Sequence, residues 1–216
     1  MDKTVSIAKE NGVRVGAHPS LPDRQGFGRR EMSMTPDELE SCFVYQVGAL
    51  QGFLSKHGMK LNHIKPHGAI YGQTSRSLPL ARAAVGVCKI FSIAGEDIAF
   101  VGLAGTAHQE AAEELGVKFI PEKLSSEWFA DLDYSPEGKL LITKVHAHVT
   151  HESVQKRVNT LLRDRKVTTI DGQLLPFDMN VDEVSICCHS DTPGAVEIAT
   201  LVKGLVDEHN RSAGHN

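Results

Sequence analysis

The chain of 216 residues has no apolar run that approaches the roughly 18 residues of a membrane-spanning helix. It also lacks a basic run long enough to follow a nucleic-acid backbone, since 23 basic and 27 acidic side chains give a net charge of -4. Its first residues, MDKTVSIAKENG, do not show the charged and then apolar pattern of a signal peptide. We therefore expect a cytoplasmic protein that binds a small molecule, and neither nucleic acid nor membrane.

Cysteine is scarce as well. The chain has Cys42, Cys88 and the adjacent pair Cys187 and Cys188, without C-x-x-C spacing, which argues against a zinc knuckle and against a disulfide framework. We interpret all four as small buried hydrophobic residues. Internal repeats and Pro/Gly/Ser linkers are also missing, so the sequence predicts a single α/β domain over residues 1–216.

Helix signals alternate with short apolar runs along the chain. Thr35-Pro36-Asp37-Glu38 is a capping box that predicts a helix from Pro36 to about Lys56, followed by Gly58. The residues before Gly12 predict the end of another helix. Further helices are predicted after Ser77, Thr106, Thr150 and Thr192-Pro193. The apolar runs predict five parallel strands, at 13–17, 61–64, 98–103, 117–120 and 184–188, and a hairpin is predicted around Pro136-Glu137-Gly138.

Reactive side chains follow four of these strands, where loops of parallel α/β folds bind ligands. We expect the four loops to converge on one site. A lone histidine after a strand, such as His18, is more often a loop residue bonded to a carbonyl than a ligand-binding residue. A lysine that closes a buried strand, in contrast, must find an anion or reach water. The side chains concerned are His18, Asp23, Arg24 and Arg29 after the first strand, Lys65 and His67 after the second, Thr106 after the third, and His189, Ser190 and Asp191 after the last.

Two histidine groups leave alternatives open. His189 and Asp191 lie two residues apart and could pair as an acid and base, or Asp191 could cap the next helix. In KVHAHVTH, His146, His148 and His151 resemble metal ligands by number, but they straddle a predicted helix start. We interpret these three as structural or solvent-exposed, and we predict no metal site.

The segments GVRVGAHPSLPDRQGFGR, HIKPHGAIY, VGLAG and CHSDTPGA, in this order, resemble the LamB/YcsF family of lactam-utilisation proteins. The resemblance implies a distorted β/α barrel of the glycoside hydrolase/deacetylase type. It further implies ATP-dependent opening of 5-oxo-L-proline to L-glutamate by a 5-oxoprolinase complex with two partner subunits. ATP with Mg²⁺ is then the expected cofactor, shared with those subunits.

Through the resemblance, Lys65, His67, His189 and Asp191 become the candidate catalytic residues. Lys65 is expected to hold an anion, and His67 or His189 to transfer protons with Asp191 orienting one of them. The family's Cys-x-His-x-Asp pattern falls on Cys187, His189 and Asp191. The candidate substrate-binding residues are His18, Asp23, Arg29 and Tyr71.

The chain departs from the family pattern in three places. The family's opening DLGE and later GFHAGDP segments are not found, so we expect the barrel to lack its first two strands and to expose strand edges that favour self-association. The family's EVFADR reads EWFADL, with Leu132 in place of arginine, and a Pro-Arg stretch reads Ile142-Thr143. Two alternatives therefore stay open: a truncated remnant that binds a partner without catalysis, and a metal-dependent deacetylase that uses His18, His67, His189 and Asp191.

Overall fold

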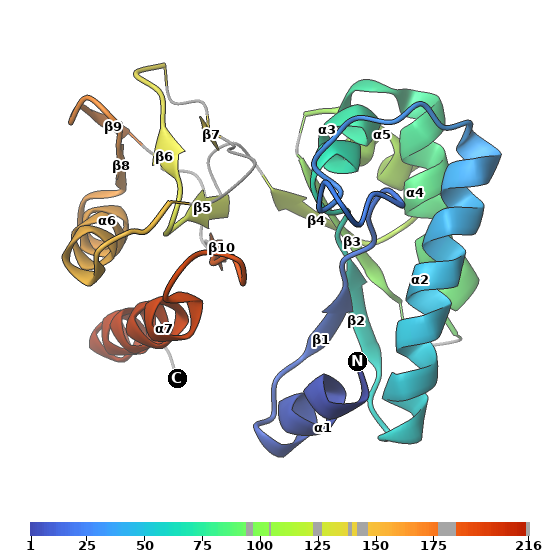
Figure 1. Cartoon of the computed structure of the whole chain (residues 1–216), viewed down its shortest axis with the longest axis horizontal. Coiled ribbons are helices and arrows are strands. Elements are labelled where there is room, and N and C mark those ends of the chain that lie inside the picture. Colours follow the sequence, from blue (N-terminus) through green and yellow to red (C-terminus); the bar gives the residue numbers. More distant parts are fainter. Residues whose placement is uncertain are drawn as a thin grey trace. The chain divides into compact units, whose positions relative to one another are not determined.

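The structure is a computed structural model, and it describes residues 1–93, 97–103, 105–122, 127–137, 140–141, 147–176 and 185–214. The chain divides into two compact units, Met1–Lys123 and Leu124–Asn216 (Figure 1). Each unit is described by itself below, and the single domain expected over residues 1–216 stays a prediction.

A four-stranded parallel sheet forms the centre of the first unit. Its strands are β1 (Val15–Ala17), β2 (Leu61–Ile64), β3 (Ala99–Leu103) and β4 (Phe119–Glu122), and they lie in the order β1-β2-β3-β4. Because parallel crossovers are right-handed, a sheet in strict sequence order carries its connecting helices on one face. The unit is thus a mixed α/β structure with a parallel sheet, consistent with a β/α barrel-like fold and with four of the predicted strands.

The described helices of this unit are α1 (Asp2–Glu10), α2 (Pro36–Lys56), α3 (Ala69–Arg76), α4 (Leu78–Phe91) and α5 (Ala107–Leu115). The predicted bounds of α2 are confirmed, and its capping box is present, with Thr35 Oγ1 accepting from the Glu38 backbone and the Glu38 carboxylate accepting from the Thr35 backbone. Gly116 ends α5 in the left-handed conformation. No described helix combines the length and apolar character that crossing a membrane requires.

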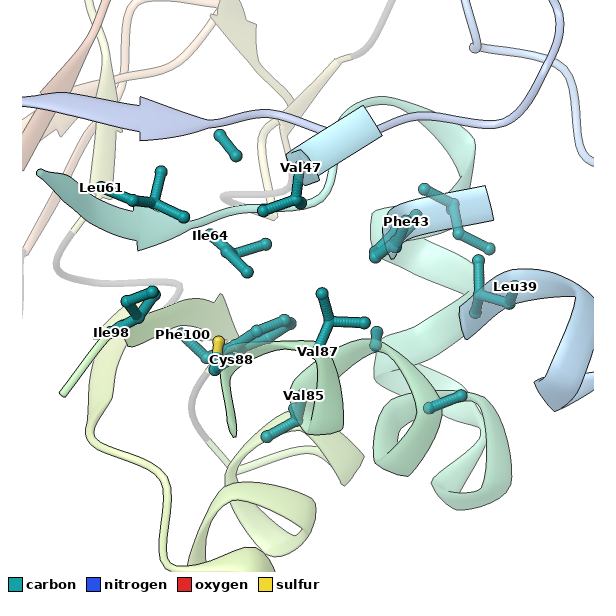
Figure 2. Packing of buried hydrophobic residues seen from close by; sticks show 14 of the residues in the cluster. Leu39, Phe43, Val47, Leu61, Ile64, Val85, Val87, Cys88, Ile98 and Phe100 are labelled. Atoms are coloured by element: carbon teal, nitrogen blue, oxygen red, sulfur yellow. The ribbon is translucent and has the colours of Figure 1, made fainter. Parts of the chain in front are cut away.

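The core of the first unit lies between the sheet and helices α2 and α4. Figure 2 shows Leu39, Phe43 and Val47 from α2 directed toward the same interior as residues of the strands and of α4. Phe100 of β3 and Ile64 of β2 are fully buried there. Since β2 ends at Ile64, its burial holds the following Lys65 at the edge of this core.

The second unit has its own small core, and its described strands form two-stranded pairs. Its elements are β5 (Glu127–Phe129), β6 (Asp133–Tyr134), β7 (Leu140–Leu141), α6 (His151–Asp164), β8 (Lys166–Thr168), β9 (Leu174–Pro176), β10 (Ser185–Cys187) and α7 (Ala195–Ser212). The last predicted strand, β10, pairs in parallel with β5, for which no strand was predicted. Helices α6 and α7 pack around a core that includes Trp128 and Val158.

Two further differences concern turns of the second unit. The hairpin predicted near Pro136-Glu137 is confirmed by the antiparallel pair β6–β7, whereas the β8–β9 pair was not predicted; Gly138 lies outside the described residues. The helix predicted after Thr192-Pro193 is confirmed as α7, but it begins at Ala195 with Gly194 at its N-terminus. The Thr192 hydroxyl donates to the Asp131 carboxylate instead of capping the helix.

The capping box of α2 can be tested by removing its hydroxyl. Thr35→Ala should lower the free energy of unfolding by about 1 kcal/mol, because the Glu38 backbone N–H loses its acceptor. Ser77→Ala is the matched control, since Ser77 stands at the N-terminus of α4 without a capping hydrogen bond from its side chain. Chemical denaturation of both variants measures the difference, and an equal effect of the two substitutions would contradict the assigned cap.

Candidate functional site

The loops after β1 and β2 are held together by backbone hydrogen bonds. The Lys65 backbone N–H donates to the Ala17 carbonyl at 2.9 Å, and the His67 N–H donates to the Pro19 carbonyl at 2.8 Å. These bonds continue the β1–β2 ladder past the ends of both strands. They bring His18 and His67, which are 49 positions apart, into contact. Two of the four predicted loops therefore meet in the first unit.

Close backbone contact at this point requires glycine. Gly68 has a φ of +69°, and a Cβ atom placed on it would lie 2.5 Å from the Gly28 carbonyl oxygen. The same carbonyl accepts from the Ala69 N–H at 2.9 Å, so the loop after β1 is bonded to the first turn of α3. A side chain at position 68 would have to push two backbone segments apart.

The contacts of the two histidines determine where their protons lie. His18 Nδ1 is 2.6 Å from the Lys65 carbonyl oxygen, and His67 Nε2 is 2.8 Å from that of Phe27. Because a carbonyl only accepts, both of these nitrogens carry hydrogen. The remaining nitrogens, His18 Nε2 and His67 Nδ1, face each other at 3.1 Å. Neutral rings would set two lone pairs against each other there, so one additional proton between them makes the contact favourable.

The surroundings of this histidine pair favour an anionic ligand. Neighbouring atoms displace water from the His18 ring, and together with the charges of His67 and Lys65 this lowers the pKa of His18 to about 4, against the opposing effect of the bond to the Lys65 carbonyl. Lys65, half-buried at the same end of β2, supplies a positive charge close to the two rings.

Phe27 belongs to the cluster although it was not among the predicted site residues. Its φ of +54° is uncommon for a residue with a side chain, and its ring meets His67 edge-on with centroids 5.2 Å apart. The Arg29 guanidinium carbon lies 5.1 Å from the Phe27 ring centroid, in a cation–π contact. The aromatic residue between two glycines in QGFGR was the only signal for this position.

The remaining predicted residues of the first unit mostly hold the loops. The Asp23 carboxylate pairs with the Arg30 guanidinium and accepts from the Gly26 N–H at 2.9 Å, so it is engaged within its own loop. Tyr71 lies in α3 with its ring 5.1 Å from that of buried His108. Thr106 caps α5 and donates to the Leu103 carbonyl at 2.6 Å.

A second polar cluster, in the second unit, is built on Asp131. Its fully buried carboxylate accepts from the His189 backbone N–H at 3.0 Å, from the Thr192 hydroxyl at 2.5 Å and from His189 Nδ1 at 3.0 Å. Burial alone would raise the pKa of Asp131, but the bonds from His189 and Thr192 outweigh it and hold the pKa below the usual value. Asp131 stays ionised, and it fixes the hydrogen of His189 on Nδ1.

Asp131 was not among the predicted site residues, although it stands in the FAD part of the family-like segment EWFADL. The orienting role was expected of Asp191, which is exposed, whereas the carboxylate that contacts His189 belongs to Asp131. Where the family pattern has arginine, Leu132 is buried, and Arg157 of α6 donates to its carbonyl at 2.9 Å. A guanidinium thus supports this turn from a neighbouring helix.

The other sequence predictions have separate outcomes. Convergence of all four loops stays a prediction, because His189 and Asp191 lie in the second unit. His148 and His151 are exposed, as expected, whereas His146 and the Ile142-Thr143 stretch lie outside the described residues. Among the described ranges, no three or more His, Cys, Asp or Glu side chains gather as metal ligands would.

Comparison with known proteins gives consistent matches. The LamB/YcsF family matches residues 1–214. The "Lactam utilization protein lamB" of Emericella nidulans is 43% identical over 215 residues, which span 99% of this chain and 80% of that protein. A 5-oxoprolinase subunit of Thermococcus onnurineus is 40% identical over 210 residues, or 96% and 78% of the two chains. The crystal structure of the lactam utilization protein from Thermus thermophilus matches with a TM-score of 0.75 and 33% identity, covering 99% of this chain and 80% of that one.

The close contact at Gly68 can be tested by adding one methyl group. Gly68→Ala should lower the free energy of unfolding by about 3 kcal/mol, through the positive φ and the contact with the Gly28 carbonyl. Gly58→Ala is the matched control, because Gly58 has a φ of +64° and no atom within 4 Å of the place that a Cβ would take, and it should cost about 1 kcal/mol. Equal losses in denaturation would show that the backbone contact is not tight.

The ion pair of Asp23 should be visible in the pH dependence of stability. Its hydrogen bond to Arg30 holds the pKa of Asp23 at about 2, below the reference value of 3.8. A depressed pKa stabilises the folded state above the unfolded pKa, so this contribution is full above pH 4 and is lost as the pH falls toward 2. Unfolding measured across this range should show a smaller loss for Asp23→Asn than for the unchanged chain. Identical pH profiles would contradict the pairing.

Proposed function

Because the chain belongs to the LamB/YcsF family, we propose that it is a subunit of a hydrolase that opens 5-oxo-L-proline, or a related small lactam, to the open-chain amino acid. The observation that carries the proposal is the match to relatives named for lactam utilization and 5-oxoprolinase, which includes both polar clusters. We further assign the parallel strands to a distorted β/α barrel of the glycoside hydrolase/deacetylase type, which the sequential strand order supports.

The cluster of the first unit is suited to the anionic parts of this reaction. A lactam such as 5-oxo-L-proline carries a carboxylate, and a phosphoryl group would add further negative charge. Lys65 is placed to hold such a group at the end of β2, beside the His18–His67 pair and with Arg29 as a second cation. Both ring nitrogens of His67 contact protein atoms, so we do not assign proton transfer to it.

Proton transfer is assigned to His189 in the second unit. Its Nδ1 donates to Asp131, which leaves Nε2 of the neutral ring as a base. Opening a lactam moves a proton from the attacking nucleophile to the ring nitrogen that leaves, and a histidine held in one tautomer can perform both transfers. Asp131 takes the orienting role first expected of Asp191.

The proposal includes ATP with Mg²⁺ and two partner subunits. A five-membered lactam is a stable amide, so attack by water alone is slow. When bound, ATP would supply a phosphoryl group that turns the amide oxygen into a better leaving group. Several relatives are named as one subunit of 5-oxoprolinase, which supports a role within a larger complex. In this chain, Lys65 and Arg29 are the residues suited to contact a phosphate.

Charge removal at the end of β2 tests the proposed anion site. Lys65→Met should lower ATP-dependent release of glutamate from 5-oxo-L-proline about 100-fold or more, because the half-buried cation is lost. The assay contains the two partner proteins of a 5-oxoprolinase complex, and circular dichroism confirms that the variant is folded. No glutamate from the unchanged chain in this assay would overturn the proposed function.

Lys60→Met is the matched control for this assay. Lys60 precedes β2, at the opposite end of the strand from Lys65, and it is exposed. The substitution removes the same charge from the same loop–strand segment and should leave turnover within about twofold of the unchanged chain. Loss of activity in both variants, or in neither, would exclude a specific role for Lys65.

A further inference from the structure

The adjacent cysteines at the end of β10 have different surroundings. Successive residues of an extended chain point to opposite sides, so Cys187 and His189 share one side and Cys188 the other. Cys188 packs against the core of the second unit with Ile186 and Val202. Cys187 Sγ lies 4.0 Å from His189 Nε2, at the outer limit of a hydrogen bond to sulfur. The prediction that all four cysteines are small buried hydrophobic residues is confirmed for Cys88, whereas Cys42, Cys187 and Cys188 are only partly buried.

Two contacts fix the orientation of the His189 ring, and a backbone hydrogen bond ties the Asp131 segment to the strand that carries the thiol. Asp131 accepts the hydrogen of Nδ1, so the lone pair of the neutral ring is on Nε2, the nitrogen nearest the sulfur. The Phe129 ring stacks on the imidazole with centroids 5.6 Å apart and an angle of 10° between the planes. The Ala130 N–H donates to the Cys187 carbonyl at 3.1 Å, which ties the Asp131 segment to the end of β10.

From this geometry we propose that Cys187 is a catalytic nucleophile, that His189 is its base and that Asp131 is the residue that positions His189. The ligand class is a small compound with an electrophilic amide carbonyl carbon. A thiol, a base within reach and a carboxylate that orients the base are the components of a nucleophilic cysteine site. The substrate part of this proposal rests on the proposed lactam hydrolysis.

The bond changes of this step balance with water as the only co-reactant, and the ATP of the proposed function would serve to activate the amide. His189 Nε2 takes the thiol proton, and the Cys187 sulfur forms a bond to the carbonyl carbon. The C–N bond of the ring breaks, and its electron pair stays on nitrogen, which takes the proton from His189. Water then adds its hydroxyl group to the acyl carbon and gives its proton to His189. The C–S bond breaks with its electron pair on sulfur, which takes the proton from His189, so that the amino acid is released and the thiol is regenerated.

The neighbouring cysteine provides an internal comparison. Burial and the charge of Asp131 raise the pKa of Cys188 to about 11, so its thiol stays protonated near neutral pH. Burial likewise raises the pKa of Cys88 to about 12. A thiol-selective reagent at neutral pH should therefore distinguish Cys187 from these two residues.

Alkylation of the full chain with iodoacetamide at about pH 7, followed by mass spectrometry, tests the reactivity. The fast modification should persist in Cys188→Ala and disappear in Cys187→Ala. His189→Gln should slow it about tenfold, because the thiolate loses its base. Asp131→Asn should slow it as well, and circular dichroism shows whether each variant is folded. Modification of Cys187 at the rate of N-acetylcysteine, or at a rate that His189→Gln leaves unchanged, would overturn the proposal.

Turnover separates this inference from the proposed function. In the assay with partner proteins, Cys187→Ala should lose glutamate release by about 100-fold or more, and Cys188→Ala should keep it. Glutamate release by Cys187→Ala at the unchanged rate would overturn Cys187 as nucleophile and leave the lactam reaction in place. No release from the unchanged chain would overturn the lactam reaction, and the alkylation rates would still decide whether Cys187 is activated.

Discussion

Two backbone hydrogen bonds beyond the ends of β1 and β2 determine the structure of the first cluster. The Lys65 N–H donates to the Ala17 carbonyl and the His67 N–H donates to the Pro19 carbonyl. Without these bonds, the two loops would diverge where their strands end. The alignment leaves no room for a side chain at Gly68, and it brings the two imidazoles into a T-shaped contact with centroids 4.9 Å apart. The polar groups are therefore placed by main-chain geometry.

Much of the first unit could be predicted from sequence because its signals are local. The capping box at Thr35, the glycine after α5 and the short apolar runs are local signals, and the structure confirms the elements they predicted. Lys65 after a buried strand end was recognisable for the same reason, because the cost of burying a cation is independent of the rest of the fold.

What could not be predicted depends on contacts distant in sequence. Asp131 accepts hydrogen bonds from His189 and Thr192, which are 58 and 61 positions away in the sequence. The residues next to Asp131 in the sequence give no signal that its carboxylate is buried. Thr192 followed by proline matches a helix start, but its hydroxyl is taken by this carboxylate, and α7 begins later. Strand β5 was missed because its short run with one tryptophan carries too little periodicity to be distinguished from a loop.

The two histidine clusters differ in the nitrogen that remains available for chemistry. In the first, each ring has one nitrogen on a backbone carbonyl and the other on its partner ring, so both nitrogens of each ring contact protein atoms. In the second, one nitrogen of His189 is committed to an ionised carboxylate, and the other faces a thiol across a longer gap. A base oriented by a carboxylate can gain and lose its proton at its second nitrogen. The roles proposed for the two clusters, anion binding by the first and proton transfer by the second, rest on this difference in which atoms accept hydrogen.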